Sequence, residues 1–139
     1  MPRFVLADTG PLYAQAMRRD GEHERAVREF AALEAQGYRL LLSQPIILET
    51  HKLLLRRNLL PYAHDYTQAL TERFHTVNPQ SEDYGTGLDI IGRFTDQPLS
   101  LFDATLAALS TRLALPVWTF DHDFDILSAA LNTEVWRPS

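Results

Sequence analysis

The chain has 139 residues, 45% of them hydrophobic, with no cysteine and a formal net charge of −5. This size predicts a single globular domain over residues 1–139, and the lack of cysteine excludes disulfides and thiolate metal sites. The negative charge argues against a nucleic-acid binder, but all except one of the 13 Lys and Arg residues are arginine, which suits bidentate phosphate contacts.

Apolar runs, helical spacing and turn residues divide the sequence into alternating strands and helices. In chain order they predict strand 4–7, helix 11–19, helix 22–36, strand 38–42, helix 45–58, helix 61–73, strand 75–77, helix 81–94, helix 101–113, strand 116–120 and helix 124–131. Residues 133–136 are a possible fifth strand at an edge of the sheet.

Several residues predict where the helices end and which faces they bury. Pro11 suits the first turn of a helix, and Gly37 suits the position just after a helix end. Helix 81–94 is weakened by three glycines, whereas helix 101–113 is apolar on most of its circumference and is expected to be central. In helix 22–36, apolar residues recur at helical spacing and are expected in the core: Ala26, Val27, Phe30, Ala31 and Leu33.

The alternation of helices with short strands that are apolar on both faces favours a parallel sheet. The expected fold is therefore α/β, with three α/β/α layers and a central, mainly parallel sheet of four or five strands. In such sheets, functional residues collect beyond the carboxyl ends of the strands.

Two aspartates directly follow predicted strands. Asp8 ends strand 4–7 and Asp121 ends strand 116–120, so a parallel sheet would point both at the same edge. Each also has a local explanation, because either one could cap the helix that follows it. Asp123 and Asp125 come next, so at least one acid exceeds the need for capping, and Asp125 resembles a first-turn helix charge.

Two further acids lie near helix starts. Asp103 follows Ser100 by three residues, as in a capping box with Asp in place of Glu or Gln. It is also a lone charge ahead of an apolar helix that should be buried. Glu49 could form a surface pair with Lys52 at i+3, worth only about 0.2–0.5 kcal/mol.

Taken together, four carboxylates from separate elements would meet on one side of the sheet: Asp8, Glu49, Asp103 and Asp121. Sites built only from oxygen ligands and rich in carboxylates suit Mg²⁺ or Mn²⁺ rather than zinc. One or two such ions can activate water and stabilise the leaving oxygen of a phosphodiester.

At this point the sequence resembles a known family, the PIN-domain ribonucleases, and within it the VapC toxins of bacterial toxin–antitoxin pairs. Four segments carry the resemblance in order and cover nearly the whole chain: Val5-Leu-Ala-Asp-Thr-Gly-Pro-Leu12, Ile47-Leu-Glu-Thr50, Leu99-Ser-Leu-Phe-Asp-Ala104 and Thr119-Phe-Asp-His-Asp-Phe124. The resemblance implies a compact α/β/α domain with an endoribonuclease site that depends on Mg²⁺ or Mn²⁺.

The resemblance also implies roles for individual residues. Three acids, Asp8, Asp103 and Asp121, would hold the metal, and Glu49 would complete the site or orient the attacking water. Three further residues are auxiliary candidates at matching positions: Asp123, Thr119 and Thr9. Three arginines are candidate phosphate contacts, with plain surface charge as the alternative: Arg56, Arg57 and Arg18.

The partners implied are an RNA substrate, a small antitoxin whose C-terminal segment covers the active groove, and a second copy of the chain in a homodimer. The apolar run at the N-terminus is too short for a signal peptide, and no run approaches the roughly 20 residues of a membrane span. We therefore expect a cytoplasmic protein without a membrane partner.

Two other classes of α/β protein also place aspartates at the ends of strands, but the sequence lacks residues that each of them needs. A phosphate-accepting receiver domain needs an adjacent acidic pair after its first strand, and here Asp8 is alone. A haloacid-dehalogenase-like phosphatase needs an aspartate where this chain has Gly10. Two alternatives keep the PIN fold: a non-catalytic module that binds RNA or protein, and an RNA-processing nuclease that is not a toxin.

Overall fold

A computed structural model of the chain describes residues 2–138 and contains one four-stranded sheet. All paired strands are parallel, in the order β3-β2-β1-β4. The strands are β1 (Arg3–Ala7), β2 (Tyr38–Ser43), β3 (His75–Val77) and β4 (Val117–Trp118). Because β1 lies between β2 and β4, the two halves of the sequence meet along it.

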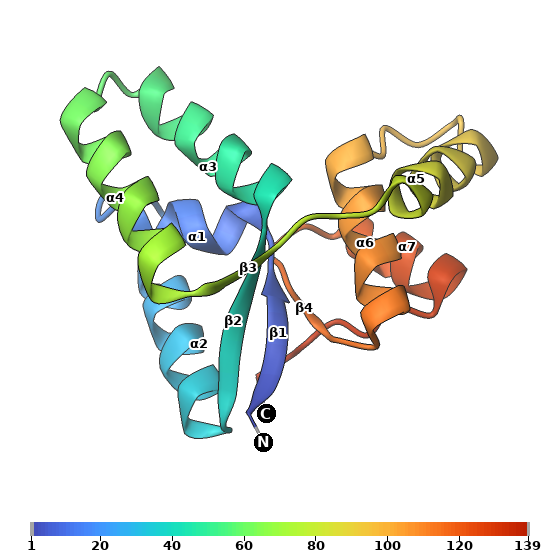
Figure 1. The fold of residues 1–139 in the computed structure, drawn as a ribbon, viewed down its shortest axis with the longest axis horizontal. Coiled ribbons are helices and arrows are strands. Elements are labelled where there is room, and N and C mark those ends of the chain that lie inside the picture. The colour runs from blue at the N-terminus through green and yellow to red at the C-terminus, as the bar shows by residue number, and fades with distance from the viewer. Residues whose placement is uncertain (1, 139) are drawn as a thin grey trace.

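Seven helices cover the sheet within the described residues (Figure 1). They are α1 (Thr9–Ala16), α2 (His23–Ala35), α3 (Gln44–Arg56), α4 (Leu60–Arg73), α5 (Ser81–Arg93), α6 (Leu101–Leu113) and α7 (Asp123–Leu131). Helices α1 to α4 lie on one side of the sheet, and α5 to α7 lie on the other. The predicted three-layer α/β/α fold with a parallel sheet is confirmed.

The last strand is shorter than predicted, and the possible fifth strand is reduced to a single bridge. Val117 forms an isolated parallel bridge with Val135, in which the Val117 amide donates to Glu134 O at 2.8 Å. After Trp118 the backbone leaves the ladder, and the Thr119 hydroxyl binds the Asp8 carboxylate and the Asp121 amide.

The main core lies between the two helical layers and includes the fully buried Trp118, Phe124 and Leu106. Helix α6 buries every residue from Asp103 to Ser110, which confirms that it is central. In α2 the expected core face is only partly right, because Val27 is 46% exposed and Ala31 is also exposed. The helix buries a narrower stripe: Ala26, Glu29 and Leu33.

The glycines of α5 do not prevent the helix from forming. Gly87 faces α6 so closely that a Cβ there would lie 3.1 Å from the Thr105 backbone nitrogen. Gly37, after α2, has a φ of 85°, as expected for a helix-ending glycine. None of the helices described is both long and apolar enough to span a membrane.

Candidate active site

Asp8 lies at the carboxyl end of β1 and serves two purposes. Its Oδ1 accepts a 2.8 Å hydrogen bond from the Thr9 amide, so it caps α1 as one of the two interpretations predicted. Its Oδ2 accepts a 2.7 Å bond from the Thr119 hydroxyl. Its own amide donates to Trp118 O at 2.9 Å, so Asp8 also joins β1 to the segment that follows β4.

Asp103 lies in the first turn of α6, where its amide donates to Ser100 Oγ at 3.1 Å. This is half of the predicted capping box. The Asp103 side chain faces the other acids, and carboxylate oxygens of Asp103, Asp121 and Asp123 all lie within 4.8 Å of one another. This trio contains Asp123 and not Asp8, which lies beside it with one hydrogen bond to each of its oxygens, from Thr9 and from Thr119.

A chain of local hydrogen bonds shapes the turn that carries Asp121 and Asp123. The Asp121 amide donates to Thr119 Oγ1 at 3.0 Å, and the Asp123 amide donates to Asp121 Oδ1 at 2.9 Å. Asp125, one turn further, lies in the first turn of α7 and pairs with Arg137 at 3.0 Å. Asp125 is therefore a helix-start charge outside the trio, as the sequence predicted.

Glu49 approaches the same edge from α3. The Thr9 hydroxyl donates a hydrogen bond to Glu49 Oε1, and the adjacent Thr9 amide binds Asp8. Within residues 2–138 no ion pair joins Glu49 to Lys52, so the surface-pair alternative is not what the structure shows. Thr9 instead links Glu49 to Asp8.

The electrostatics of the site are those of acids that lack a countercharge. Burial raises the pKa of Asp8 to about 6, assisted by the charges of Glu49 and Asp121 and opposed by the hydrogen bonds from Thr119 and Thr9. Burial also raises the pKa of Asp103 to about 8, assisted by Asp8 and by Asp121. The pKa of Asp123 is raised by burial and by Asp121. Near neutral pH these carboxylates are not all ionised unless a cation joins them.

The donor set fits a hard divalent cation. It consists of carboxylate oxygens with threonine hydroxyls behind them, which is the ligand chemistry of Mg²⁺ and Mn²⁺. The residues able to hold such an ion are Asp103, Asp121 and Asp123, with Asp8 beside them. A bound cation would favour the ionised form of each acid and so reverse the rise in their pKa values.

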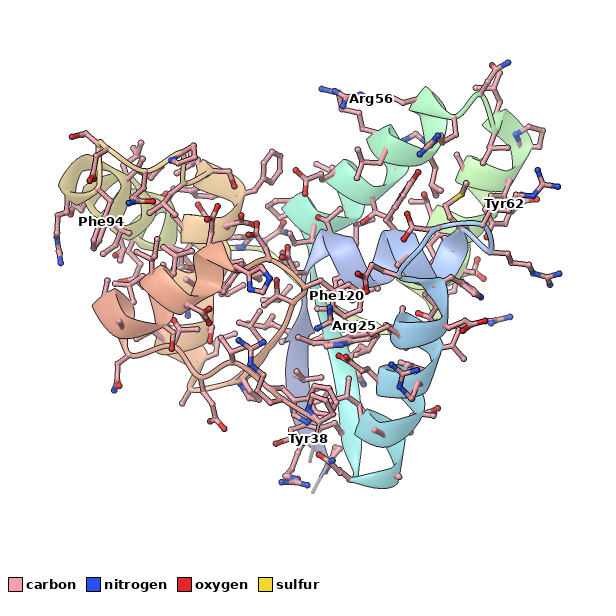
Figure 2. The ribbon with its side chains drawn as sticks, turned by 180° about the vertical axis from the view of Figure 1, so that it is seen from behind. Arg25, Tyr38, Arg56, Tyr62, Phe94 and Phe120 are labelled. Carbon is pink, nitrogen blue, oxygen red and sulfur yellow. The ribbon has the colours of Figure 1, made fainter. Side chains whose placement is uncertain are left out.

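The structure separates the three candidate arginines. Arg56, at the C-terminal end of α3 (Figure 2), lines a hollow of about 330 Å³ together with Glu49 and Lys52. Arg57 instead donates a 2.8 Å hydrogen bond to the Tyr13 hydroxyl. Arg18 is exposed and close enough to Tyr62 to act on its pKa. Arg56 thus shares a hollow with Glu49, whereas Arg57 shares one with Asp20, which is not a candidate site residue.

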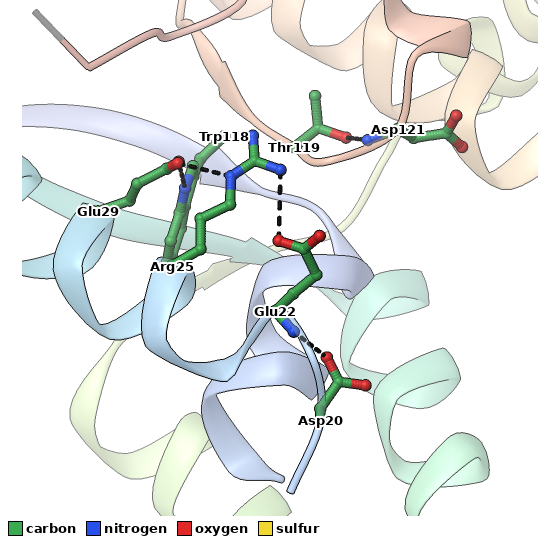
Figure 3. Close-up of polar contacts among 7 residues, drawn as sticks. All are labelled: Asp20, Glu22, Arg25, Glu29, Trp118, Thr119 and Asp121. Atoms are coloured by element: carbon green, nitrogen blue, oxygen red, sulfur yellow. Dashed lines mark hydrogen bonds and ion pairs between the residues drawn. The ribbon is translucent and has the colours of Figure 1, made fainter. Parts of the chain in front are cut away.

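The sequence did not predict a partly buried ion pair beside the site, between Arg25 and Glu29 of α2 (Figure 3). Glu29 on α2 is 5% exposed and accepts hydrogen bonds from Trp118 Nε1 at 3.0 Å and Arg25 Nε at 2.8 Å. The Arg25 guanidinium also lies 4.0 Å from the centre of the Phe120 ring. An available signal was the spacing of Glu29 with Ala26 and Leu33, which places an acid on the buried stripe of α2.

The chain matches a known protein family over most of its length. Residues 5–129 match the family model described as the PIN domain. The chain belongs to the PIN domain family. No curated protein sequence matches it. The predicted membership of this family is confirmed. The prediction rested on four short sequence segments that occur in the expected order over nearly the whole chain.

Solved PIN-domain structures share the fold at low sequence identity. VapC20 of Mycobacterium tuberculosis, a sarcin–ricin loop cleaving toxin, is 23% identical with a TM-score of 0.76, covering 91% of this chain and 94% of that one. VapBC2 of Rickettsia felis, bound to a promoter DNA fragment, is 9% identical with a TM-score of 0.71, covering 96% and 99%. VapBC-5 of Mycobacterium tuberculosis is 16% identical with a TM-score of 0.65, covering 98% and 99%. At these identities the likeness concerns the PIN fold.

Proposed function

We propose that this chain is a single-domain, Mg²⁺- or Mn²⁺-dependent endoribonuclease that hydrolyses RNA phosphodiester bonds in the cytoplasm. The observation that carries the proposal is the acidic edge, defined as Asp8, Glu49, Asp103, Asp121 and Asp123. Its members come from the end of β1, from α3, from α6 and from the turn that begins α7, and burial with mutual repulsion raises the pKa values of Asp8 and Asp103. Membership of the PIN domain family supports a nuclease as the use of such a site.

In this proposal the chain's own residues divide the work. Asp103, Asp121 and Asp123, with Asp8, hold the cation, which when bound supplies an activated water and charge stabilisation at the leaving oxygen. Thr119 and Thr9 fix the orientation of Asp8, and Thr9 also binds Glu49 Oε1. The other oxygen, Glu49 Oε2, is left to orient the attacking water and accept its proton.

RNA cleavage with and without Mg²⁺, for the wild type and Asp8→Asn, tests the proposal. We expect cleavage by the wild type only with the metal, and none by Asp8→Asn. The matched control is Asp125→Asn, an acid of the same segment that pairs with Arg137 and should leave cleavage intact. Equal cleavage by the wild type and Asp8→Asn would contradict the site assignment.

Metal binding separates the nuclease from a non-catalytic PIN module. Calorimetry with Mn²⁺ should show binding by the wild type that is weakened by Asp103→Asn, because Asp103 belongs to the close trio of carboxylates. A scaffold without catalytic function would show no Mn²⁺ affinity that depends on these acids.

We further propose that the nuclease is the toxin of a toxin–antitoxin pair. VapC20 is described as a toxin that cleaves the sarcin–ricin loop, and VapBC-5 belongs to a family of toxin–antitoxin systems. The test is the neighbouring gene, which should encode a small protein with a DNA-binding N-terminus. That protein should co-purify with the chain and abolish RNA cleavage. A solitary gene whose product trims a defined RNA would favour the RNA-processing alternative.

We also propose that two copies pair through an apolar face that flanks the acidic edge. Four apolar side chains on this face are exposed around a hollow of about 300 Å³: Leu48 (66%), Phe102 (43%), Leu101 (39%) and Tyr84 (39%). Large contiguous apolar patches mark interaction sites. Sedimentation should show a dimer that Leu48→Glu converts to a monomer, while the exposed Val27→Glu on α2 leaves it dimeric. A monomeric wild type would overturn this pairing.

A further inference from the structure

The segment that carries Thr119 and Asp121 is not held by the sheet. Strand β4 ends at Trp118, and Asp121 enters the acidic edge three residues later. Thr119 accepts from the Asp121 amide and donates to Asp8 Oδ2, which ties the segment to the end of β1. The two aromatic neighbours, Trp118 and Phe120, anchor the segment to α2.

The first anchor is Trp118. Its side chain is fully buried, and its Nε1 donates a 3.0 Å hydrogen bond to Glu29 Oε1, 89 positions earlier in the sequence. Glu29 is itself buried and uses its second oxygen to accept from Arg25 Nε at 2.8 Å. A buried carboxylate costs several kcal/mol to desolvate and is tolerated when it is paired and hydrogen-bonded. Glu29 meets both conditions, and the residue that it binds, Trp118, immediately precedes Thr119 in the sequence.

The second anchor is Phe120, the residue between Thr119 and Asp121. Its ring meets Trp118 edge-on, with centroids 6.2 Å apart. The Arg25 guanidinium covers the ring at 4.0 Å, in cation–π geometry. Arg25 is steadied on its outer side by Glu22, at 3.5 Å (Figure 3). Arg25 therefore touches the aromatic side chain next to Asp121 and the carboxylate that binds Trp118.

We infer that Arg25 and Glu29 of α2 are positioning residues for the acidic edge. They clamp Trp118 and Phe120 so that Thr119 reaches Asp8 and Asp121 reaches Asp103. This inference rests on the proposed function for its effect on catalysis, but the clamp itself is a property of the metal-free fold. Partners that orient metal ligands from behind typically affect metal affinity or activity by about 10–100-fold.

The test compares Arg25→Met, which keeps the stem and removes the guanidinium, with Arg112→Met. Arg112 makes a similar ion pair with buried Asp83 between α5 and α6, away from the Thr119–Asp121 segment. Both variants should lower the unfolding temperature. In metal-free protein, only Arg25→Met should speed hydrogen exchange of the Asp121 amide, at least about tenfold relative to core amides.

The same variants are then compared in Mn²⁺ affinity and RNA cleavage. Arg25→Met should weaken Mn²⁺ binding and lower kcat by about 10-fold or more, with KM nearly unchanged, because Arg25 positions acids without touching RNA. Arg25→Lys keeps the pair with Glu29 but loses the flat guanidinium over Phe120, so it should restore part of both losses. Arg112→Met should leave Mn²⁺ affinity and kcat unchanged.

The outcomes separate the inference from the proposed function. Exchange at the Asp121 amide that is unchanged in both Arg25→Met and Arg25→Lys would overturn the clamp, whatever the activity. Faster exchange in a protein whose wild type cuts no RNA would support the clamp and reject the nuclease. Equal losses of kcat in Arg25→Met and Arg112→Met would reduce Arg25 to a general contributor to stability.

Discussion

Two buried acids lie at opposite ends of helix α6, and they differ in their charged neighbours and in the direction of their pKa shift. Asp103 is in the first turn of α6, and Asp83 of α5 is bound by Arg112 in the last turn of α6. At its last turn, Arg112 makes two 2.9 Å bonds to Asp83, which is 2% exposed. These contacts hold the pKa of Asp83 below its usual value. At its first turn, Asp103 faces Asp8 and Asp121 and has a pKa raised to about 8.

The difference supports the proposal that Asp103 is a functional acid and Asp83 a structural one. Asp83 is buried with its own countercharge, and its pair joins α5 to α6. Asp103 is buried among other acids, and in the proposed function a bound cation supplies its countercharge. Perturbed pKa values of this kind cluster at functional sites.

The largest effect is expected from a comparison of two aspartates that follow β4, Asp121 inside the acidic edge and Asp125 outside it. Asp121→Asn should lower kcat/KM for RNA cleavage by at least about 10³-fold, equivalent to about 4 kcal/mol of transition-state stabilisation. Asp125→Asn should change it less than about twofold, because Asp125 pairs with Arg137 outside the acidic edge. Comparable losses in the two variants would erase the distinction drawn within this segment.

Mutations at the two ends of α6 should change the free energy of unfolding in opposite directions. Arg112→Met leaves the buried Asp83 without its partner and should lower the unfolding free energy. Asp103→Asn removes a charge that burial and repulsion oppose, so it should stabilise the metal-free protein by about 1–2 kcal/mol at pH 8. Denaturant unfolding in a chelator measures both, and a destabilised Asp103→Asn would contradict the reading of this acid as unpaired.

The pH dependence of stability follows from the same acids. Burial raises the pKa of Asp8 to about 6 and that of Asp103 to about 8, above the usual value of 3.8 for an aspartate. Between these values the folded chain retains protons that the unfolded chain has lost. Metal-free stability should therefore fall as pH rises from about 4 to about 8, by up to about 1.4 kcal/mol per pH unit for each proton retained.

The measurement for this pH effect is the unfolding temperature in a chelator across that window. Saturating Mn²⁺ should flatten or reverse the slope, because the cation binds the ionised acids. Asp103→Asn should remove the part of the slope above pH 6. A metal-free protein that becomes more stable from pH 5 to 8 would show that the acids already have a countercharge.

The smallest expected effect concerns the neighbouring arginines Arg56 and Arg57. Arg56 lines the hollow that holds Glu49, so Arg56→Ala should raise the KM for RNA about three- to tenfold, more at low salt. Arg57 is bonded to Tyr13, and Arg57→Ala should change KM less than about twofold. Cleavage assays over a salt series measure both, and identical salt dependence in the two variants would remove Arg56 from the substrate path.

Much of the fold was predictable because its signals are local. Apolar runs and helical spacing gave the parallel α/β layers, and Gly37 marked the end of α2 as expected. The length of β4 was overestimated because residues 119–120 have strand-like composition but lie beyond the end of the ladder, where the Thr119 hydroxyl binds the Asp8 carboxylate. The burial of Glu29 depends on Trp118, which lies 89 positions away, and no periodicity encodes that pairing.

The candidate site was predictable in composition and less so in arrangement. Asp8 and Asp121 follow strands that a parallel sheet must bring to one edge, so their proximity follows from the topology. That Asp123 joins the close trio while Asp8 turns to two threonines depends on side-chain hydrogen bonds of the folded turn. The division between Arg56 and Arg57 depends likewise on a contact with Tyr13 from a different helix.

The sheet order has a consequence for when the protein can act during its synthesis. Strand β1 pairs with β4, so Asp8 and Glu49 are translated long before Asp103 and Asp121 can join them. Domains fold as their chains emerge from the ribosome, N-terminal parts first. A nascent chain that ends before residue 117 lacks the β1–β4 pairing and two of the five acids of the acidic edge, Asp121 and Asp123. Under the proposed function, such a chain would not yet cleave the messenger from which it is made.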